Sequence, residues 1–447
     1  MSKKDNFYLC NNCGNEFSRW SGQCPLCKEW NSLKELKITE SANLKTKGEK
    51  SECVSAFSSV SSERFKTNIK EFDRVLGGGF FPDEFVLLTG DPGVGKSTLA
   101  LQSAMSLSVQ MPLIYFSGEE SVSQVSDRVN RLNSKEKKLN LKIAAENSLE
   151  NIIATIEQED CKIVVIDSIQ TISSATLPAV AGSLSQVRFC TETLMHFLKK
   201  KKIACLLIGH VNKSGDFAGP QTLAHLVDCV LFLEGDKYHQ FRILRGQKNR
   251  FGSTAEIGIF EMIEAGLKEV ENPSQSFLEG RLENAEGSVI IPTIEGTRPF
   301  LVELQALTSW TNFGYPKRTA SGIDINRLAL MIAVLQKHGK QKLENLYIFV
   351  NIVGGFKIAE HSADLGLLLA IASSKLKKNL DPATVVFGEV GLSGEIRRVP
   401  QTEKRLKEAE KLGFKQAIIP KGGKPEKSAL KIIYLKSINE ALNVLTK

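Results

Sequence analysis

The chain has no apolar run long enough to cross a membrane. Of its 447 residues 42% are hydrophobic, yet the longest nearly uncharged apolar stretch of the C-terminal half, Leu365 to Ala372, is far short of the roughly 20 residues that a spanning helix needs. Met1 to Asp5 are followed by cysteines and polar residues, and they lack the apolar segment of a secretory signal. We therefore expect a cytoplasmic protein with no membrane partner, long enough for two or three domains.

Cysteine is scarce beyond the N-terminal region. Four of the nine cysteines form two CxxC pairs within the first 27 residues, Cys10 with Cys13 and Cys24 with Cys27. In a reducing compartment such pairs indicate a metal site rather than disulfides. Each pair forms a tight knuckle that directs two sulfurs at one point, and four thiolates complete the tetrahedron that zinc prefers. The other cysteines are interpreted as small core residues: Cys53, Cys161, Cys190, Cys205 and Cys229.

This zinc site should be structural. Four protein ligands fill the coordination sphere and leave no position for a reactive water. A block this small has almost no core of its own, so the metal should be what folds it. Two tryptophans of the block, Trp20 and Trp30, either stack on nucleic-acid bases or pack over the zinc knuckles.

Positive charge is concentrated at the C-terminal end. The net charge is +8, and residues 391–447 hold 13 Lys or Arg against 6 Asp or Glu, so this segment alone supplies +7. A basic end suits a polyanion such as nucleic acid, and a solvated lysine-rich surface is the alternative.

The pattern along the chain predicts an α/β protein of several parts. Residues 1–37 form a zinc-binding domain, and residues 38–62, rich in Ser, Lys, Glu and Asn, form a linker. In residues 63–270 short apolar runs alternate with helical patterns, which is typical of a mostly parallel sheet buried on both faces. The texture changes around residues 266–275, and a second α/β pattern fills residues 271–447. The apolar runs of the first pattern are 85–89, 113–116, 163–166 and 204–208, and one intervening helix has a stripe of Val187, Cys190, Leu194, Phe197 and Leu198.

A complete GxxxxGK[ST] pattern lies between a predicted strand and a predicted helix. Its glycines allow backbone N–H groups to wrap phosphates at the helix N-terminus, Lys96 reaches the β and γ phosphates, and Ser97 offers its hydroxyl to magnesium. The chain should therefore bind ATP with magnesium. The predicted nucleotide-binding residues of this segment are Gly90, Asp91, Pro92, Gly93, Val94, Gly95, Lys96, Ser97 and Thr98.

Three further polar residues follow predicted strands at the same edge of the sheet. Asp167 ends the run 163–166 and can hold the magnesium hydration shell. Glu119 follows the run 113–116, and its carboxylate can orient or deprotonate the attacking water; a loop carboxylate with no catalytic task is the alternative. His210 follows the run 204–208 and can sense the γ phosphate, unless it is a structural histidine held by hydrogen bonds.

Several motifs together resemble RadA (Sms), a family of bacterial recombination and DNA repair ATPases. The resemblance covers essentially the whole chain, and its most specific part is the pentapeptide Lys248-Asn249-Arg250-Phe251-Gly252. The other motifs that carry it are the head from Cys10 to Trp30, Leu76-Gly77-Gly78-Gly79, and Phe116-Ser117-Gly118-Glu119-Glu120-Ser121. The chain departs from the family at Pro82-Asp83, where a glycine is expected at the second position, and we expect a type I turn to tolerate this.

The resemblance implies a RecA-like ATPase core that assembles as a homo-hexameric ring around single-stranded DNA. It also implies that Lys248 and Arg250 lie at a subunit boundary and act on the ATP of the neighbour, as an arginine finger does; an ordinary basic turn is the alternative. Two segments, 173–185 and 212–222, match the loops that face the channel in RecA-like rings. With small residues and few cations besides Lys213, they suit sequence-independent contact with the DNA backbone.

Residues 275–447 resemble the proteolytic domain of Lon, whose chemistry is a Ser-Lys dyad. Ser362 falls at the nucleophile position, but the alignment places Glu403 where the lysine should be, and a shift of one residue would bring Lys404 there instead. Asp364 replaces a glycine of the serine turn. We therefore expect a domain without proteolytic activity that serves oligomerisation and contact with DNA.

Three functions compete at this stage. The first is a ring-type DNA motor or helicase, a DNA-dependent ATPase that acts on single-stranded or branched DNA in recombination and repair, alongside the recombinase RecA. The second is an ATP-dependent serine protease of the Lon type. The third is a regulatory ATPase whose ring is a scaffold without translocation.

Overall fold

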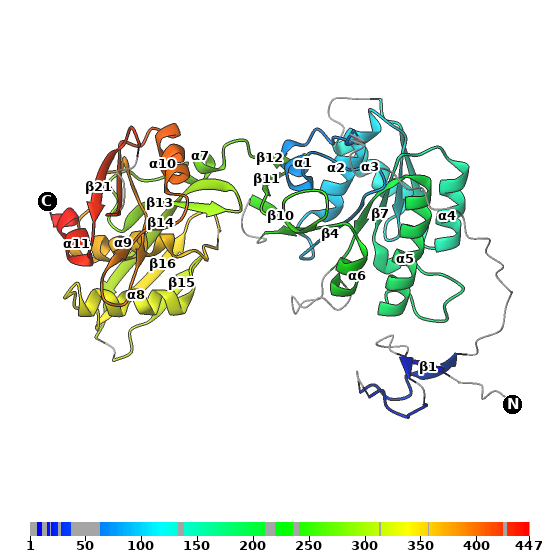
Figure 1. Cartoon of the computed structure of the whole chain (residues 1–447), viewed down its shortest axis with the longest axis horizontal. Coiled ribbons are helices and arrows are strands. Elements are labelled where there is room, and N and C mark those ends of the chain that lie inside the picture. Colours follow the sequence, from blue (N-terminus) through cyan, green and yellow to red (C-terminus); the bar gives the residue numbers. More distant parts are fainter. Residues whose placement is uncertain are drawn as a thin grey trace. The chain divides into compact units, whose positions relative to one another are not determined.

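The computed structural model describes residues 7–10, 16–17, 19–25, 28–36, 63–132, 138–210, 220–235, 241–312, 314–355, 357–422 and 427–446. Its described residues divide into two compact units. The first holds the described residues up to 235 together with 243–254 and 262–268, and the second holds 241–242, 255–261 and the described residues from 269 onwards. Both units are mixtures of helices and strands, so the α/β prediction is confirmed (Figure 1). Among the described residues no helix combines the length and the apolarity needed to cross a bilayer.

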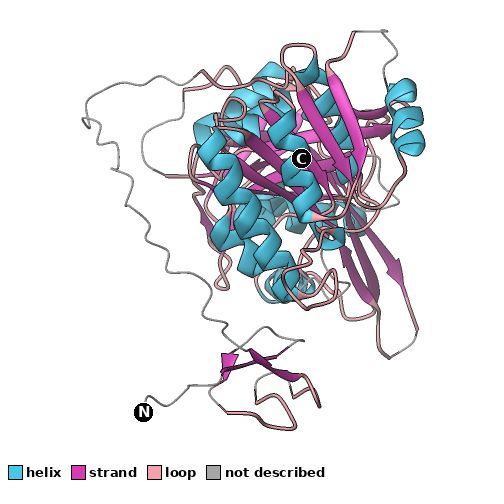
Figure 2. Ribbon diagram, turned by 90° about the vertical axis from the view of Figure 1, so that its right-hand side faces the viewer, coloured by secondary structure: helices cyan, strands magenta, loops and turns pink. Residues whose placement is uncertain are grey.

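The N-terminal head is a small sheet of three strands in the order β2-β1-β3 (Figure 2). Cys10 and Cys24 are buried there in one cluster with Leu33, which is nearly all the core that the head has among its described residues. The strands are β1 (Phe7–Cys10), β2 (Glu16–Phe17) and β3 (Leu33–Leu36).

The first unit is built on strands of a sheet with the order β12-β11-β10-β9-β4-β8-β7-β5-β6, in which residues 257–261 of β11 are counted with the second unit. The strands from β9 to β6 in this order are parallel, and β10 joins β9 antiparallel. The four apolar runs of the sequence form the central strands. The strands are β4 (Phe85–Gly90), β5 (Leu113–Ser117), β6 (Leu141–Ala145), β7 (Ile163–Asp167), β8 (Ala204–Ile208), β9 (Cys229–Glu234), β10 (Phe241–Asn249), β11 (Ile257–Ile263) and β12 (Gly266–Glu269).

Helices bury both faces of this sheet, as the continuous apolar runs require. Phe85 and Leu87 of β4 face a cluster that includes the predicted stripe of the long helix α5, and the alternate residues of β4 are buried towards the other face. The helices are α1 (Lys70–Leu76), α2 (Lys96–Ser108), α3 (Val122–Leu132), α4 (Leu149–Gln158), the short η1 (Ile169–Thr171), α5 (Leu184–Lys201) and α6 (Pro220–Leu226). The core prediction for the cysteines is confirmed for Cys161, Cys190, Cys205 and Cys229, and Cys53 lies outside the described residues.

The turn at Pro82-Asp83 differs from the prediction. Asp83 has a φ of 68°, and Glu84 N donates to Phe81 O at 3.0 Å. A positive φ at the third position of such a turn fits type II rather than type I. This conformation explains why glycine suits the position, and aspartate is among the residues that tolerate it.

The second unit is built on a seven-stranded sheet in the order β15-β16-β14-β13-β17-β20-β21, with a separate pair of β18 and β19. Its long strands β13 and β14 form an antiparallel hairpin, and helix α9 packs on both of them. The strands are β13 (Ser288–Glu295), β14 (Arg298–Trp310), β15 (Arg318–Ser321), β16 (Leu346–Ile352), β17 (Thr384–Val386), β18 (Glu389–Val390), β19 (Ile396–Arg397), β20 (Gln416–Pro420) and β21 (Lys431–Leu435). The helices are α7 (Pro273–Leu278), α8 (Ile325–Lys337), the short η2 (His361–Ala363), α9 (Asp364–Leu376), α10 (Thr402–Lys411) and α11 (Ile438–Thr446).

Candidate nucleotide site and its distant partners

The phosphate loop joins the end of β4 to the start of α2, as predicted. Gly90, Gly93 and Gly95 all have positive φ, and a Cβ at Gly90 would come within 2.0 Å of the Leu233 carbonyl oxygen, so only glycine fits there. The Lys96 amine donates to Gly90 O at 2.8 Å and to Asp91 O at 2.9 Å. Burial lowers the pKa of Lys96 below its ordinary value, against the opposing effect of nearby carboxylates. A buried cation at a helix N-terminus within a ring of glycine amides is a site for polyphosphate.

Asp167 lies next to this loop at the end of β7. Its carboxylate is buried, and it accepts hydrogen bonds from the hydroxyls of Tyr115, at 2.6 Å, and Ser97. Burial raises the pKa of Asp167, and the two hydroxyls counteract that rise. The Ser97 hydroxyl and the Asp167 carboxylate are oxygen donors in direct contact, which fits magnesium with its preference for hard oxygen ligands.

Glu119 and Glu120 are adjacent in sequence but have different partners. Glu119 Oε1 accepts a hydrogen bond of 2.7 Å from the Ser168 hydroxyl and lies 3.3 Å from His210 Nε2. Glu120 pairs with Arg128 of α3 at 2.6 Å. The structure therefore brings Glu119, Asp167 and His210 together at the carboxyl edge of the sheet. Sequence reasoning missed Ser168, although its place directly after Asp167 was a usable signal.

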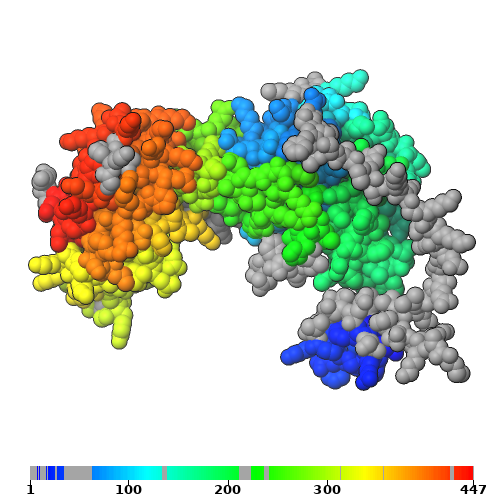
Figure 3. All heavy atoms as spheres, in the orientation of Figure 1, coloured from blue at the N-terminus to red at the C-terminus, as the bar shows by residue number. Residues whose placement is uncertain are grey.

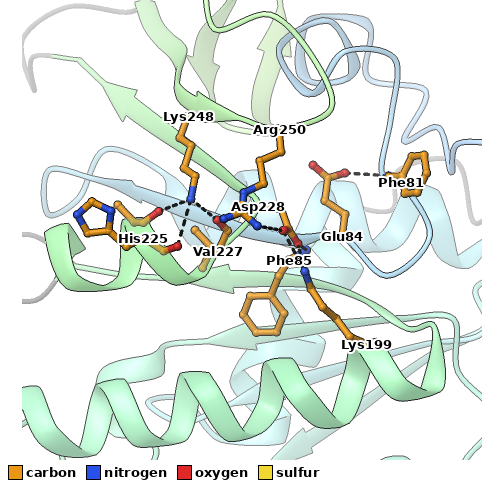
Figure 4. A network of polar contacts seen from close by, with 10 residues as sticks. Phe81, Glu84, Phe85, Lys199, His225, Val227, Asp228, Lys248 and Arg250 are labelled. Atoms are coloured by element: carbon orange, nitrogen blue, oxygen red, sulfur yellow. Dashed lines mark hydrogen bonds and ion pairs between the residues drawn. The ribbon is translucent and has the colours of Figure 1, made fainter. Parts of the chain in front are cut away.

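Lys248 and Arg250 lie at the opposite, amino edge of the sheet. The end of β10 pairs with the start of β9, which pairs in turn with the start of β4. Arg250 Nη1 contacts Asp228 at 3.2 Å, and Asp228 accepts from the backbone N–H of Phe85, the first residue of β4 (Figure 4). The strand from Phe85 to Gly90 spans about 16 Å. The structure therefore does not bring Arg250 to the phosphate loop of its own subunit.

The Lys248 amine caps a helix. It donates to Ala224 O and Val227 O at 2.7 Å and to His225 O at 3.3 Å, at the C-terminal end of α6 (Figure 4). These contacts use all three donors of an ammonium group. Burial and the charge of Arg250 lower the pKa of Lys248. A cation at this end of a helix satisfies carbonyls that have no partner within the helix.

The rest of the pentapeptide packs on a motif far away in the sequence. Asn249 Nδ2 donates to Leu76 O at 3.2 Å, at the end of α1. The ring of Phe251 stacks on that of Phe81 with centroids 4.7 Å apart. A Cβ at Gly252 would come within 2.9 Å of the Asn249 amide, which explains the glycine. The pentapeptide 248–252 thus packs against the family motif Leu76-Gly77-Gly78-Gly79.

The Lon-like serine meets a residue that the sequence alignment did not place there. Ser362 is buried, and its hydroxyl accepts from Arg405 Nη1 at 3.1 Å. Glu403 and Lys404 are exposed on α10, whose segment is drawn in orange at the surface of the molecule (Figure 3), so neither of them lies against the serine. Helical periodicity is the reason, because the buried positions of α10 are Arg405, Leu406 and Ala409. A guanidinium stays protonated in proteins and cannot take a proton from serine.

The head contains two of the four predicted zinc ligands within the described residues. Cys10 and Cys24 are 0% and 1% exposed and belong to one cluster, so two sulfurs are gathered in the interior as thiolate ligands would be. Cys13 and Cys27 lie outside the described residues. Trp20 and Trp30 are exposed, and a Cβ at Gly22 would lie 3.9 Å from the ring of Trp20 and 3.6 Å from that of Trp30.

Comparison with known proteins identifies the family. Residues 8–35 match a model described as a rubredoxin metal binding domain, residues 51–216 an AAA domain, and residues 327–423 the subunit ChlI of Mg-chelatase. The chain is 44% identical over 455 residues to the DNA repair protein RadA of Halalkalibacterium halodurans, which covers 99% of both chains. It is also 44% identical over 450 residues to that of Escherichia coli, covering 98% of this chain and 97% of that protein. The chain belongs to the RadA family.

Membership of the RadA family confirms the coarse predictions. The fold combines a zinc-binding head, a RecA-like ATPase core and a Lon-like C-terminal domain, and the cofactors are ATP, magnesium and zinc. Among solved structures the chain is similar to the RadB recombinase, with 22% identity and a TM-score of 0.37 over 46% of this chain and 100% of that one.

Proposed function

We propose that this RadA-family chain is a DNA-dependent ATPase and ring-type DNA motor, active in the cytoplasm on single-stranded or branched DNA. Each nucleotide site is completed by the next subunit of a hexameric ring, and the motor works alongside RecA on recombination intermediates. The family supports the roles in ATP hydrolysis and DNA repair. The observation that carries the shared site is the position of Arg250 at the sheet edge opposite the phosphate loop.

Hydrolysis takes place at the carboxyl edge. Glu119 accepts a proton from the attacking water, whose oxygen bonds to the γ phosphorus while the bond to the β,γ-bridging oxygen breaks, leaving ADP and phosphate. The Ser168 hydroxyl holds the Glu119 carboxylate by a hydrogen bond, and His210 Nε2 lies 3.3 Å from it. Ser97 and Asp167 would hold a magnesium ion, which would neutralise phosphate charge there.

A cation is still needed for the charge that develops on the transferred phosphoryl group. Arg250 cannot supply it within its own subunit, because about 16 Å of strand separates its Asp228 anchor from Gly90. Its side chain is 53% exposed, which leaves it open to a neighbour. In a head-to-tail ring each subunit presents one edge to the next, so a group at the amino edge can serve the nucleotide of another subunit. Lys248 lies two residues away at the same edge and acts at the same boundary, for which it must first leave its contacts at the end of α6.

Mixed rings test the shared site. Lys96→Ala destroys the phosphate site, and Arg250→Ala removes the finger, so each variant alone should hydrolyse ATP at a small fraction of the parent rate. In an equimolar mixture a quarter of the boundaries join an intact phosphate site to an intact finger, so turnover should reach about a quarter of the parent value. A mixture no more active than its components would contradict a site shared between subunits.

The DNA-contacting role is proposed for the two loops that follow β7 and β8. Gln186, buried in α5, donates to the carbonyl oxygens of Ser174, Leu177 and Ala179 and so holds the first loop. A loop of small residues fixed in this way suits backbone contact with a strand that passes it. Residues 212–219 of the second loop lie outside the described residues. Binding should weaken as salt rises and depend little on base sequence.

The protease alternative is disfavoured by Arg405. The group in contact with Ser362 lacks the free amine that a Ser-Lys dyad uses as a base. We propose that the Lon-like domain serves oligomerisation and contact with DNA instead. A scaffold without translocation would show ATP turnover that DNA does not change.

A further inference from the structure

One buried carboxylate in the ATPase core has no part in the hydrolysis described above. Asp228 lies between α6 and β9 and is 1% exposed. It accepts from the backbone N–H of Phe85 at 3.1 Å, from the Lys199 amine at 2.8 Å, and from Arg250 Nη1 at 3.2 Å (Figure 4). One side chain thus connects the first residue of the phosphate-loop strand, the end of α5 and the candidate finger.

The backbone fixes this carboxylate firmly. Asp228 N donates to Phe85 O at 2.9 Å, and Arg250 N donates to Asp228 O at 3.1 Å. These backbone hydrogen bonds alone hold Asp228 at the amino edge of the sheet. An anchor of this kind can restrict a long arginine side chain that would otherwise sample many rotamers.

The contact with Asp228 restricts the Arg250 guanidinium but leaves most of its N–H donors available. Within the described residues its side-chain partner is the Asp228 carboxylate, and it binds through Nη1. The side chain remains 53% exposed, whereas that of Asp228 is 2% exposed. An arginine has five N–H donors in a planar fork, so most of them remain available for phosphate oxygens.

Lys248, unlike Arg250, has no donor left for a neighbouring subunit. Its three donors are already occupied by carbonyl oxygens at the end of α6. Of the two cations of the pentapeptide, Arg250 is therefore the one that can reach a neighbour without first breaking contacts in its own subunit. The position of its side chain depends on Asp228.

We propose that Asp228 is a positioning residue for ATP hydrolysis, which aims the guanidinium of Arg250 at the nucleotide of the adjacent subunit. This rests on the proposed shared site. The carboxylate does not touch the nucleotide of either subunit and acts only through Arg250. Its loss should lower kcat and leave the affinity of the same subunit for ATP unchanged, because the phosphate loop lies at the other edge of the sheet.

The decisive variant is Asp228→Asn, which keeps the shape and an acceptor for the Phe85 N–H but removes the charge that holds Arg250. We expect kcat to fall roughly ten- to hundredfold, as for a misplaced catalytic group, with KM for ATP within twofold of the parent. Mixed with Lys96→Ala, which retains a correctly held finger, the variant should recover about a quarter of the parent turnover.

Two further variants separate positioning from folding. Lys199→Met removes the other cation of Asp228 and leaves Arg250 in place, so its turnover should stay within about twofold of the parent. The double variant Asp228→Asn with Lys199→Met removes one negative and one positive charge together, which protects the fold if the single variant proves unstable. It should show the same fall in kcat and the same recovery with Lys96→Ala.

The outcomes are distinct. If Arg250→Ala recovers activity with Lys96→Ala but neither Asp228 variant does, Asp228 supports the nucleotide site of its own subunit and the positioning role is refuted, while the shared site stands. If Arg250→Ala also fails to recover, the shared site is refuted and the positioning role with it. A raised KM for ATP in both Asp228 variants, or a Lys199→Met variant as inactive as Asp228→Asn, would likewise overturn the proposal.

Discussion

Glu84, directly before β4, is the most strongly perturbed carboxyl of the ATPase core that the structure describes. Burial raises its pKa to about 7, although the backbone N–H of Phe81 donates to Oε2 at 2.8 Å and Arg64 lies nearby. The charges of Asp228 and Asp83 raise it further. Among the described residues its other oxygen, Oε1, is buried without a hydrogen-bond partner. Glu84 is therefore a site where ionisation opposes folding.

Replacing Glu84 with glutamine should stabilise the ATPase core at pH 8. The folded pKa of about 7 lies above the ordinary value of 4.5, so the folded state binds the proton more tightly, and the parent loses stability as pH rises from 4.5 to 7. The gain of Glu84→Gln should be about 1–3 kcal/mol at pH 8, and it should shrink towards pH 5. Urea unfolding at several pH values measures it. A difference that stays constant, or that grows in acid, would show that burial does not perturb this carboxyl.

At the residue scale the sequence predicted where the site residues lie in the fold, but not which side chains contact one another. The phosphate loop, Asp167, Glu119 and His210 follow strands, so their shared edge was predictable from spacing. The contact of Asp228 with Phe85 joins residues 143 positions apart, and the contact of Arg405 with Ser362 joins residues 43 apart. No local pattern marks such pairs, because they are created by the pairing of strands and the packing of helices.

Helix α6 is short, and its C-terminal end depends on one side chain. Lys248→Met keeps the length of the side chain but removes its three donors. We expect amide hydrogens of residues 223–227 to exchange about tenfold faster, since carbonyls at the helix end lose a cap worth roughly 1 kcal/mol. Hydrogen exchange read by mass spectrometry measures this. Arg250→Met is the matched control, with the same change of charge two residues away and no contact with α6 among the described residues. Equal protection of α6 in the parent and both variants would mean that Lys248 does not cap the helix.

Helix α10 carries the buried arginine of the Lon-like domain. Arg405 is 1% exposed and contacts Pro292 O at 2.6 Å and the Glu360 carboxylate at 2.5 Å. Burial tends to raise the pKa of Glu360, but the contact with Arg405 outweighs it and holds the value below the ordinary one. The ion pair therefore occupies the place where a dyad would need a neutral amine.

Arg405→Met should destabilise the Lon-like domain by about 3–5 kcal/mol, because it leaves the Glu360 carboxylate partly buried without its cation. Thermal unfolding followed by calorimetry measures this. Ser362→Ala removes one hydrogen bond and should cost about 1 kcal/mol. Arg397→Met, which breaks an exposed pair with Glu395, should cost less than about 1 kcal/mol. Equal losses for Arg405→Met and Arg397→Met would mean that the buried pair contributes no more than a surface pair.

At the element scale the apolar runs were sufficient to predict the central strands of the ATPase core, because a strand buried on both faces is apolar at every position. The extension of the sheet through β10 to β12, which begins with β10 antiparallel to β9, was not predicted, since half-exposed strands such as β10 lack a continuous run. The turn at Asp83 was assigned the wrong type because aspartate tolerates both signs of φ. In α10 the alignment placed Glu403 beside Ser362, whereas the residue that contacts Ser362 is Arg405, two positions later.

At the scale of the whole molecule the three parts were predictable from composition and motifs, and the family confirms them. The proposed limits of the domains remain a prediction, since short segments between residues 241 and 268 are assigned in turn to one compact unit and the other. Assembly into a ring is a proposal that follows from the two edges of one sheet. In such a ring two neighbouring subunits together hydrolyse ATP, and a single chain does not.

ATP turnover by the zinc-loaded protein with magnesium, measured with and without single-stranded DNA, tests the central claim. The account predicts that DNA raises the rate severalfold, and that Glu119→Gln lowers it about a hundredfold or more because the base is lost. Glu120→Gln, which breaks only the pair with Arg128, should stay within about threefold of the parent. A rate that DNA does not change, or a Glu119→Gln variant as active as Glu120→Gln, would contradict the account.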